Sequence, residues 1–360
     1  MIIRALAVFG AILTLFLVAS ACNLTKHSTG MSNVLSIAWQ EDRYLWVSET
    51  DKLIRWNVQT QEPEIFWNIS GSLLVDARNN LWVFDQNRVH HFDGQTWEQF
   101  TPEDGFIGGY VLSIAETDEC IWLGTVGLSC YNPQDKLWSV VFDTPPGPPP
   151  TPSSGDIFVE TWIEGILSIA PDEEGIWVGS NRGLTYLHNN YQQTWGNDIL
   201  GINGIPCLLK TNQNELWICT ENGLGIWDGF QWTNFKEIPG PLALVQGKEK
   251  EIWVITDEVG IGRWNGKSWD WWTPGEGPVG LRQKSLVVSS TDGNVWVGTE
   301  KGISRWDENH WRTYRTLEGL PSDYINTIFQ DPQGILWAGT NNGLSYYNPD
   351  TDRWYSFLNQ

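Results

Sequence analysis

A short phrase centred on a tryptophan recurs eight times along this chain of 360 residues. Each copy places the tryptophan between aliphatic or small residues, continues through a polar turn, and ends in a segment that carries an aromatic residue. Successive copies are 36, 40, 55, 40, 36, 43 and 41 residues apart. A recurrence near 40 residues indicates one supersecondary unit copied in series. The eight tryptophans are Trp46, Trp82, Trp122, Trp177, Trp217, Trp253, Trp296 and Trp337.

The last copy predicts the structure of the unit. Short alternating segments at 324–328, 335–340, 344–347 and 353–357 are expected strands. The turn signals between them include Asp331-Pro332-Gln333-Gly334 and Asn341-Asn342-Gly343. Four short antiparallel strands in about 40 residues are the composition of a propeller blade. We therefore predict an all-β fold, an eight-bladed β-propeller, with a seven-bladed ring plus one outside unit as the alternative.

The array begins and ends in phase. Residues 34–38 are an expected first strand and 353–357 an expected fourth strand, so no blade is predicted to share strands from both termini. Closure of the ring would then depend on packing between the first and last blades.

Two further aromatic series support this register. One follows the second-strand tryptophan by 15 to 18 residues, with Trp67 in this role at 21 residues in the first unit. Large rings bury roughly 150–250 Å² each, and we interpret both series as packing between blades. The first series is Trp97, Trp138, Trp195, Trp232, Trp269, Trp311 and Trp354; the second is Trp56, Phe92, Tyr131, Trp227, Trp264, Trp306 and Tyr347.

The N-terminus has the layout of a secretory signal peptide. Arg4 precedes an uncharged apolar run from Ala5 to Ala19, which is short for a membrane span. The segment Val18-Ala19-Ser20-Ala21-Cys22 resembles the lipobox of bacterial lipoproteins, although Ala19 replaces the usual leucine. The resemblance implies lipidation of Cys22, export, and anchoring to a membrane of the cell envelope on its periplasmic or cell-surface side. A plain signal peptide and an uncleaved anchor are the alternatives.

These features divide the chain into a signal peptide (1–22), a tether (23–32) and a single propeller (33–360). A proline-rich insertion at 143–161 interrupts the array between the third and fourth units. Because the repeat continues on both sides, and proline at this density does not pair in a sheet, we expect the insertion to form a loop.

Four cysteines remain after Cys22, in two local pairs. Cys120 with Cys130 and Cys207 with Cys219 are suited to disulfides in an oxidising compartment. They are equally suited to be small apolar core residues of adjacent strands. Neither pair has the spacing of a zinc site, and no metal or cofactor is predicted.

The net charge of −21 restricts the partners. Nucleic acid binding depends on Lys and Arg neutralising phosphates, so no nucleic acid partner is expected. Docking of the folded domain on an anionic lipid surface is disfavoured for the same reason, which leaves the N-terminal lipid as the only membrane contact.

The chain resembles a known family, the two-component regulator propeller repeat, over essentially residues 33–360. The resemblance is strong in the last two units and weaker in the first two. The resemblance is carried by residues 319–328, Gly-Leu-Pro-Ser-Asp-Tyr-Ile-Asn-Thr-Ile, and residues 334–344, Gly-Ile-Leu-Trp-Ala-Gly-Thr-Asn-Asn-Gly-Leu. Arrays of such repeats form the exported sensor half of hybrid histidine kinases. The resemblance implies a β-propeller that senses a glycan or small ligand. The sequence contains no kinase core and no DNA-binding segment, so we expect a stand-alone propeller.

A few aromatic residues fall outside the repeating series and are the candidate ligand-binding residues. Exposed aromatic rings can stack on the faces of sugars, and loops on a rigid scaffold concentrate binding residues. The alternative for Trp271 and Trp272 is continuation of the fourth strand, and for the two tyrosines it is packing between blades. The candidates are Trp162, Trp271, Trp272, Tyr110 and Tyr324.

No catalytic residue is predicted. Nucleophile-elbow, HExxH and phosphate-loop patterns are absent from the sequence. The adjacent His90 and His91 would point to opposite faces of a strand. Acidic turns such as the one at Asp331 are interpreted as turn caps. We therefore expect a non-enzymatic module that binds an extracellular ligand or an envelope protein. A propeller hydrolase or lyase with carboxylates at the channel mouth is the alternative, and a structural scaffold is a third reading.

Overall fold

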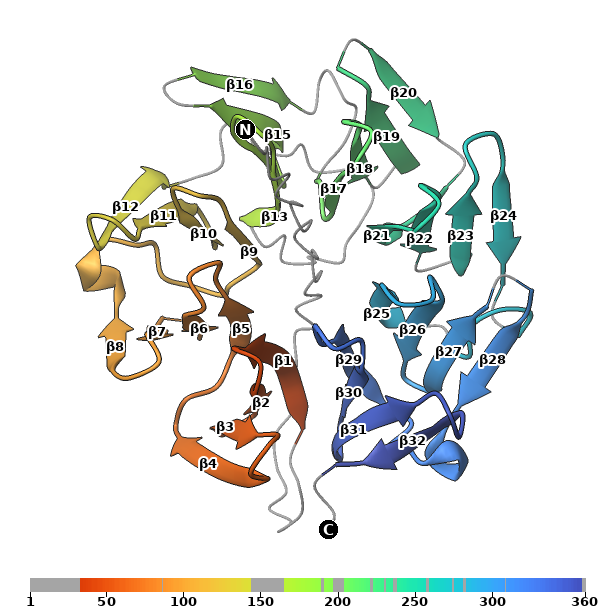
Figure 1. The fold of residues 1–360 in the computed structure, drawn as a ribbon. Helices are drawn as coiled ribbons and strands as arrows, with labels where there is room; N and C mark the ends of the chain where they lie inside the picture. Colours follow the sequence, from red (N-terminus) through yellow and green to blue (C-terminus); the bar gives the residue numbers. More distant parts are fainter. Residues whose placement is uncertain are drawn as a thin grey trace, which may run out of the picture.

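The computed structural model describes residues 33–143 except 86, and residues 165–357 except 189–190, 197–203, 221–222, 230, 236–237, 257–258, 274, 281–282 and 308. Within these residues, eight four-stranded antiparallel sheets are arranged in a ring (Figure 1), which confirms the predicted eight-bladed β-propeller. The helical elements of this part of the chain are two 3-10 turns, and none of its helices could cross a membrane. Residues 1–32, and with them Cys22, lie outside the described residues.

Each blade uses four consecutive strands. Blades 1 to 4 are β1 (Val34–Gln40), β2 (Tyr44–Glu49), β3 (Lys52–Asn57), β4 (Glu62–Trp67); β5 (Ser72–Val75), β6 (Leu81–Phe84), β7 (Val89–Phe92), β8 (Trp97–Phe100); β9 (Ser113–Glu116), β10 (Ile121–Gly124), β11 (Leu128–Asn132), β12 (Leu137–Phe142); and β13 (Ile166–Pro171), β14 (Ile176–Ser180), β15 (Gly183–His188), β16 (Tyr191–Gly196).

Blades 5 to 8 continue the pattern. They are β17 (Leu208–Lys210), β18 (Leu216–Thr220), β19 (Gly223–Trp227), β20 (Trp232–Phe235); β21 (Pro241–Gln246), β22 (Ile252–Thr256), β23 (Ile261–Trp264), β24 (Trp269–Trp272); β25 (Gln283–Val288), β26 (Val295–Thr299), β27 (Gly302–Trp306), β28 (Trp311–Tyr314); and β29 (Ile325–Gln330), β30 (Leu336–Thr340), β31 (Gly343–Asn348), β32 (Arg353–Ser356).

The antiparallel order gives the ring two different faces. The start of each first strand lies beside the end of the second strand, as Val34 pairs with Glu49 in blade 1. The loops between blades and the hairpins between the second and third strands therefore share one face, which we name the loop face. The other hairpins share the opposite face, the turn face.

The turns on the turn face orient the buried second-strand tryptophans. Among the described residues, the indole N–H of this tryptophan donates to a nearby side chain in seven blades. In blade 8, Asp331 accepts from the Trp337 indole at 2.9 Å and also from the backbone N–H of Ile335 at 2.8 Å, so one carboxylate caps the turn and fixes the ring. The seven acceptors are Gln40, Asp76, Thr117, Asp172, Glu215, Glu251 and Asp331.

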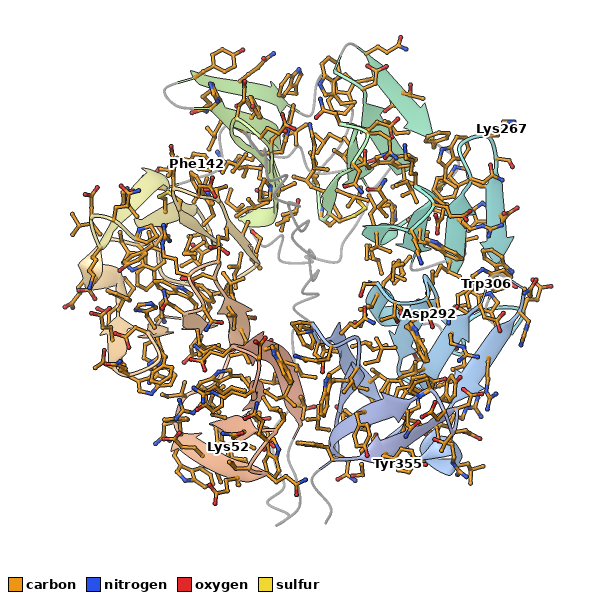
Figure 2. All side chains as sticks on the ribbon, in the orientation of Figure 1. Lys52, Phe142, Lys267, Asp292, Trp306 and Tyr355 are labelled. Carbon is orange, nitrogen blue, oxygen red and sulfur yellow. A yellow bond between two sulfur atoms is a disulfide. The ribbon has the colours of Figure 1, made fainter. Side chains whose placement is uncertain are left out.

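Aromatic side chains fill the space between neighbouring blades, as predicted. Trp296 of blade 7 contacts Tyr347 and Trp354 of blade 8, with ring centroids 4.7 and 5.8 Å apart. Trp306, labelled in Figure 2, packs with residues of blade 6, including Trp253. Such edge-to-face contacts add to the apolar area that the rings bury.

Two residues were assigned wrongly to the first of the predicted aromatic series. In six blades, this tryptophan lies opposite an aromatic residue of the third strand. Trp195 instead lies opposite Leu184, and Trp67 lies opposite Lys52 and is 60% exposed. The fourth strand has two aromatic positions that are three or four residues apart. Spacing along the chain does not distinguish them, whereas the pairing of the third and fourth strands does.

The register shows a further aromatic series that the sequence analysis missed. One aromatic residue lies opposite the start of the third strand in every blade, 18 to 20 residues after the second-strand tryptophan. This position closes the apolar layer at the loop face. Its members are Phe66, Phe100, Phe142, Trp195, Phe235, Trp272, Tyr314 and Phe357.

The ring closes between blades 8 and 1 without exchange of strands. Val34 and Val47 of blade 1 pack in one cluster with Trp337 and Leu344 of blade 8. On the loop face, the side-chain amide of Asn326 donates to the carbonyl oxygen of Val34 at 3.1 Å. Packing between the first and last blades therefore closes the ring, as the phase of the array predicts.

Candidate functional site

The loop between blades 2 and 3 is fixed by hydrogen bonds over most of its length. Thr101 donates its backbone N–H to Asp104 Oδ2 at 2.7 Å, which begins a 3-10 turn over Pro102–Asp104. Further along, the N–H of Ile107 donates to Ser129 Oγ at 3.0 Å. The loop is thus held against blade 3 before it reaches its exposed end.

Tyr110 lies at the end of this loop and is 60% exposed. The preceding Gly109 donates its N–H to Asn87 Oδ1 at 3.0 Å, and its Cα lies beside the exposed Val126 of the hairpin between β10 and β11. The backbone on one side of Tyr110 is therefore ordered while its ring remains in contact with solvent. An aromatic side chain on a hydrogen-bonded backbone loses less conformational freedom when it binds a ligand than one on a flexible segment.

Tyr324 has the equivalent place before the first strand of blade 8, and it is half-buried. Its carbonyl oxygen accepts the N–H of Asn341 at 3.2 Å. The Asn326 amide donates to Asn341 Oδ1 at 3.1 Å and to Asn33 Oδ1 at 2.6 Å. Three asparagine amides therefore meet beside Tyr324. The repeat pattern alone does not single out these asparagines, although Asn341 occupies the same hairpin position in blade 8 as the exposed Val126 in blade 3.

Trp271 and Trp272 both lie in β24, the fourth strand of blade 6. Trp272 belongs to the aromatic series at the loop-face end. Its ring stacks on that of Trp253, with centroids 5.6 Å apart, and lies tilted against that of Trp306 of blade 7, at 4.7 Å. Trp271 lies opposite Gly262, whose missing side chain leaves room for the indole. Both rings are half-buried in packing within and between blades.

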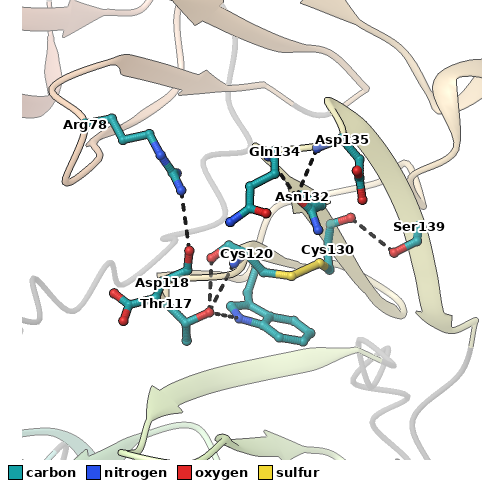
Figure 3. The surroundings of a disulfide bond; sticks show 10 residues. Arg78, Thr117, Asp118, Cys120, Cys130, Asn132, Gln134, Asp135 and Ser139 are labelled. Carbon is teal, nitrogen blue, oxygen red and sulfur yellow. Dashed lines mark hydrogen bonds between the residues drawn. A yellow bond between two sulfur atoms is a disulfide. The ribbon is translucent and has the colours of Figure 1, made fainter. Parts of the chain in front are cut away.

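The other predicted site residues fall in different places. Trp162 lies outside the described residues. Tyr110 and Tyr324 are on the same face but in blades 3 and 8, so they belong to separate parts of the ring. Cys120 is joined to Cys130 (Figure 3), and Cys207 to Cys219, as disulfides. Each bridge joins a residue of one strand, Cys130 in β11 or Cys219 in β18, to the residue just before a neighbouring strand of the same blade. Both bridges are nearly or fully buried.

The titratable groups of the described residues are mostly engaged in the fold. Burial raises the pKa of Asp331, whereas Asp172 has its pKa lowered: burial opposes this, but hydrogen bonds from Lys210 and Trp177 prevail. Burial lowers the pKa of His90. Within the described ranges, no group of three or more His, Cys, Asp or Glu side chains is placed to hold a metal ion.

These features define the class of the protein, an eight-bladed β-propeller whose loop face carries exposed side chains such as that of Tyr110. The family described as two component regulator propeller matches residues 319–342. This match lies in the last unit of the chain and confirms that the chain carries the two-component regulator propeller repeat that its sequence resembles. No curated protein matches the chain in sequence.

Solved structures are similar to this chain in fold. The extracellular domain of a hybrid two-component system from B. thetaiotaomicron is 16% identical, with a TM-score of 0.52, and the match covers 91% of this chain and 53% of that one. This chain thus spans about half the length of that structure. A computationally designed protein, Ika8, is 11% identical with a TM-score of 0.57 over 91% and 98% of the two chains. Streptogramin B lyase is 12% identical with a TM-score of 0.50 over 89% and 94%. At these identities the similarity extends to the fold alone.

Proposed function

We propose that this protein is an exported β-propeller that binds an extracellular ligand, a glycan or another small molecule, or a partner protein, through its loop face. The observation that carries the proposal is the exposure of Tyr110 at the end of an otherwise hydrogen-bonded loop. A ring that packed between blades would be buried or half-buried, as the aromatic residues opposite the third strands are.

The chemistry of the loop face favours an uncharged ligand. Asn33, Asn326 and Asn341 supply neutral amides beside Tyr324, and Val126 adds an apolar surface next to the loop of Tyr110. Amide groups donate and accept hydrogen bonds, which suits hydroxyl or peptide groups. The net charge of −21 would repel polyanions.

A glycan array followed by calorimetric titration tests the proposal. We expect Tyr110→Ala to weaken binding of any ligand found by at least about tenfold, which corresponds to about 1.4 kcal/mol. Tyr191→Ala is the matched control, because Tyr191 is an exposed tyrosine of an outer strand, β16. Equal binding by wild type and Tyr110→Ala would place the ligand elsewhere. Absence of binding across glycans, peptides and envelope-protein pull-downs would count against a binding role.

The proposal includes a lipid anchor at Cys22. The chain enters the propeller at Asn33 on the loop face, so the ten residues 23–32 would hold this face within about 35 Å of the membrane, given about 3.5 Å per extended residue. Cys22→Ser is expected to release the protein from membranes. Detection of the variant in the membrane fraction at the wild-type level would remove the anchor from the proposal.

A further inference from the structure

Two blades place an arginine between the buried second-strand tryptophan and an acidic residue. In blade 1, Arg55 lies opposite Trp46 on one side and opposite Glu64 on the other. Its guanidinium carbon is 5.5 Å from the Trp46 ring centroid, and it forms an ion pair with Glu64. The cation thus contacts both the face of an aromatic ring and a carboxylate, and both contacts favour a positive charge.

Blade 6 repeats the arrangement. Arg263 lies opposite Trp253 and Asp270. The guanidinium carbon is 5.8 Å from the Trp253 ring, and a guanidinium nitrogen is 2.7 Å from the Asp270 carboxylate. The register of the second, third and fourth strands therefore creates a place for a cation at this position of a blade.

In blade 2 the same register position holds a histidine. His91 lies opposite Trp82 and Glu98. The imidazole centroid is 4.2 Å from the Trp82 ring, and Nδ1 is 3.1 Å from Glu98 Oε2. The side chain is only 11% exposed, and Nε2 has no hydrogen-bond partner among the described residues. An arginine here would be charged at every physiological pH, whereas an imidazole ordinarily changes charge near pH 6.5.

We propose that His91 makes the contact between blades 2 and 3 dependent on pH: protonation completes the tryptophan–cation–carboxylate arrangement, and deprotonation removes it. Trp82, on which the imidazole stacks, packs directly against Tyr131 and Trp138 of blade 3, at 4.9 and 6.4 Å. The inference goes beyond the proposed function and holds whether or not the loop face binds a ligand.

The groups around His91 set the sign of the effect. Glu98 faces it from β8, and Asp93 follows it in the next turn. The pKa of Asp93 is lowered to about 2 by hydrogen bonds from the backbone of Thr96 and Gln95, so this carboxylate is negative throughout the range in which imidazole titrates. Asp93 therefore carries a fixed negative charge two residues from His91. On the blade 3 side, burial raises the pKa of Tyr131, which keeps that hydroxyl neutral.

Two further groups complete the surroundings. Asp76, which accepts the indole N–H of Trp82 at 2.9 Å, adds a carboxylate from the turn between β5 and β6. The neighbouring His90 acts in the opposite sense. It faces the other side of β7, toward Trp97, and burial and the nearby Arg88 lower its pKa. The lowered pKa of His90 favours its own neutral imidazole, so a test must separate the two histidines.

The contact continues to the loop that ends in Tyr110. Trp138 packs against Phe106 with ring centroids 5.1 Å apart, and Phe106 belongs to that loop. A weaker position of Trp82 would weaken its contact with Trp138, and in turn the contact of Trp138 with Phe106 of the loop. The order of residues 101–112 is thus expected to follow the charge of His91.

Titration of the imidazole resonances by NMR tests the proposal directly. We expect Glu98→Gln to lower the pH midpoint of the His91 resonance while leaving that of His310, an exposed histidine beside Asp307, unchanged. We also compare the thermal midpoints of wild type and His91→Gln. The amount by which wild type exceeds the variant should be larger at pH 5.5 than at pH 8, by about 1–3 °C. His310→Gln serves as the control for a general effect of losing one histidine.

The His91→Arg variant supplies the second arm. We expect hydrogen exchange in residues 101–112 to be slower in His91→Arg than in wild type at pH 8. At pH 5.5 the two proteins should exchange at the same rate. A His91 midpoint unaffected by Glu98→Gln would overturn the proposal even if His91→Gln did not fold. A difference in thermal midpoint between wild type and His91→Gln that is the same at both pH values would also overturn it.

Discussion

The side-chain amide of Asn326 donates a hydrogen bond to the carbonyl oxygen of Val34 at 3.1 Å, across 292 residues of sequence. The two residues belong to the first strands of the last and first blades. The same amide also donates to Asn33 and Asn341. Because no strand is shared between the termini, this contact and the apolar cluster beneath it hold the ring closed.

Replacement of Asn326 by alanine is expected to weaken this closure. The Val34 carbonyl would lose a partly buried donor, and the free energy of unfolding should fall by about 1–2 kcal/mol. Urea unfolding followed by tryptophan fluorescence measures the change. Asn309→Ala, at an exposed residue in the turn after β27, is the control and should leave the midpoint unchanged. Equal midpoints for both variants would show that packing alone closes the ring.

Two buried serines at the same register position should respond differently to alanine. Ser304 accepts the N–H of Val279 at 2.9 Å, as Ser129 accepts that of Ile107. In blade 8 the equivalent donor position is Pro321, two residues after the glycine that ends its 3-10 turn, and proline has no N–H. Ser345 Oγ accordingly has no partner among the described residues.

We therefore expect Ser304→Ala to cost about 1–2 kcal/mol and Ser345→Ala to cost close to nothing, because only the first leaves a backbone donor unsatisfied. Chemical denaturation of the two variants side by side tests the difference. Equal losses would mean that the serine hydroxyls contribute through packing and not through the loop N–H.

The ion pair of Lys210 with Asp172 predicts a dependence on pH. The two side chains are 2.9 Å apart and mostly buried. Burial would raise the pKa of Asp172, but Lys210 and Trp177 hold it below its ordinary value. A carboxyl group with a lowered folded pKa contributes stability above its unfolded pKa, near 4, and this contribution is lost as the pH falls through the folded pKa.

Lys210→Met should consequently lower the free energy of unfolding by about 1–3 kcal/mol at pH 7, and the difference from wild type should shrink toward pH 3. Denaturant unfolding at a series of pH values measures it. Lys267→Met, at an exposed turn residue, is the control. A difference that stays constant between pH 7 and pH 3 would contradict the assignment to this ion pair.

Trp272 offers a test of packing against binding. Its ring contacts Trp253, Trp306 and Trp311 across blades 6 and 7. Truncation to alanine should destabilise the fold by about 3–5 kcal/mol, the range for a large aromatic side chain removed from a core. A calorimetric scan measures the loss. A Trp272→Ala variant with wild-type stability would return this residue to the candidate ligand-binding surface.

The disulfides should stabilise single blades. Cys120–Cys130 and Cys207–Cys219 close loops with sequence separations of 10 and 12 residues. Loops of this size restrict the unfolded chain by an amount worth about 2–3 kcal/mol each. Paired Cys→Ala variants should lower the thermal midpoint, and a reductant should lower that of wild type but not that of a variant lacking all four cysteines. Insensitivity of wild type to reductant would show that the bridges do not form in solution.

The sequence by itself determined the repeat, the number of blades and the four strands of each. These depend on local signals, namely alternating apolar residues and turns such as the one at Asp331. Because the unit recurs with a period near 40 residues, each signal is present in eight copies. The exposed Tyr110 could also be selected from the sequence, because it falls outside the repeating aromatic positions.

Tertiary structure alone decided which aromatic residues are equivalent and what lies beside them. Trp195 and Trp272 share a register position that spacing did not reveal, because hairpin length varies between blades. The meeting of Asn326 with Asn33 depends on ring closure, and the position of His91 between Trp82 and Glu98 depends on the pairing of three strands. Contacts of this kind are set by register and packing between segments, which a one-dimensional period does not encode.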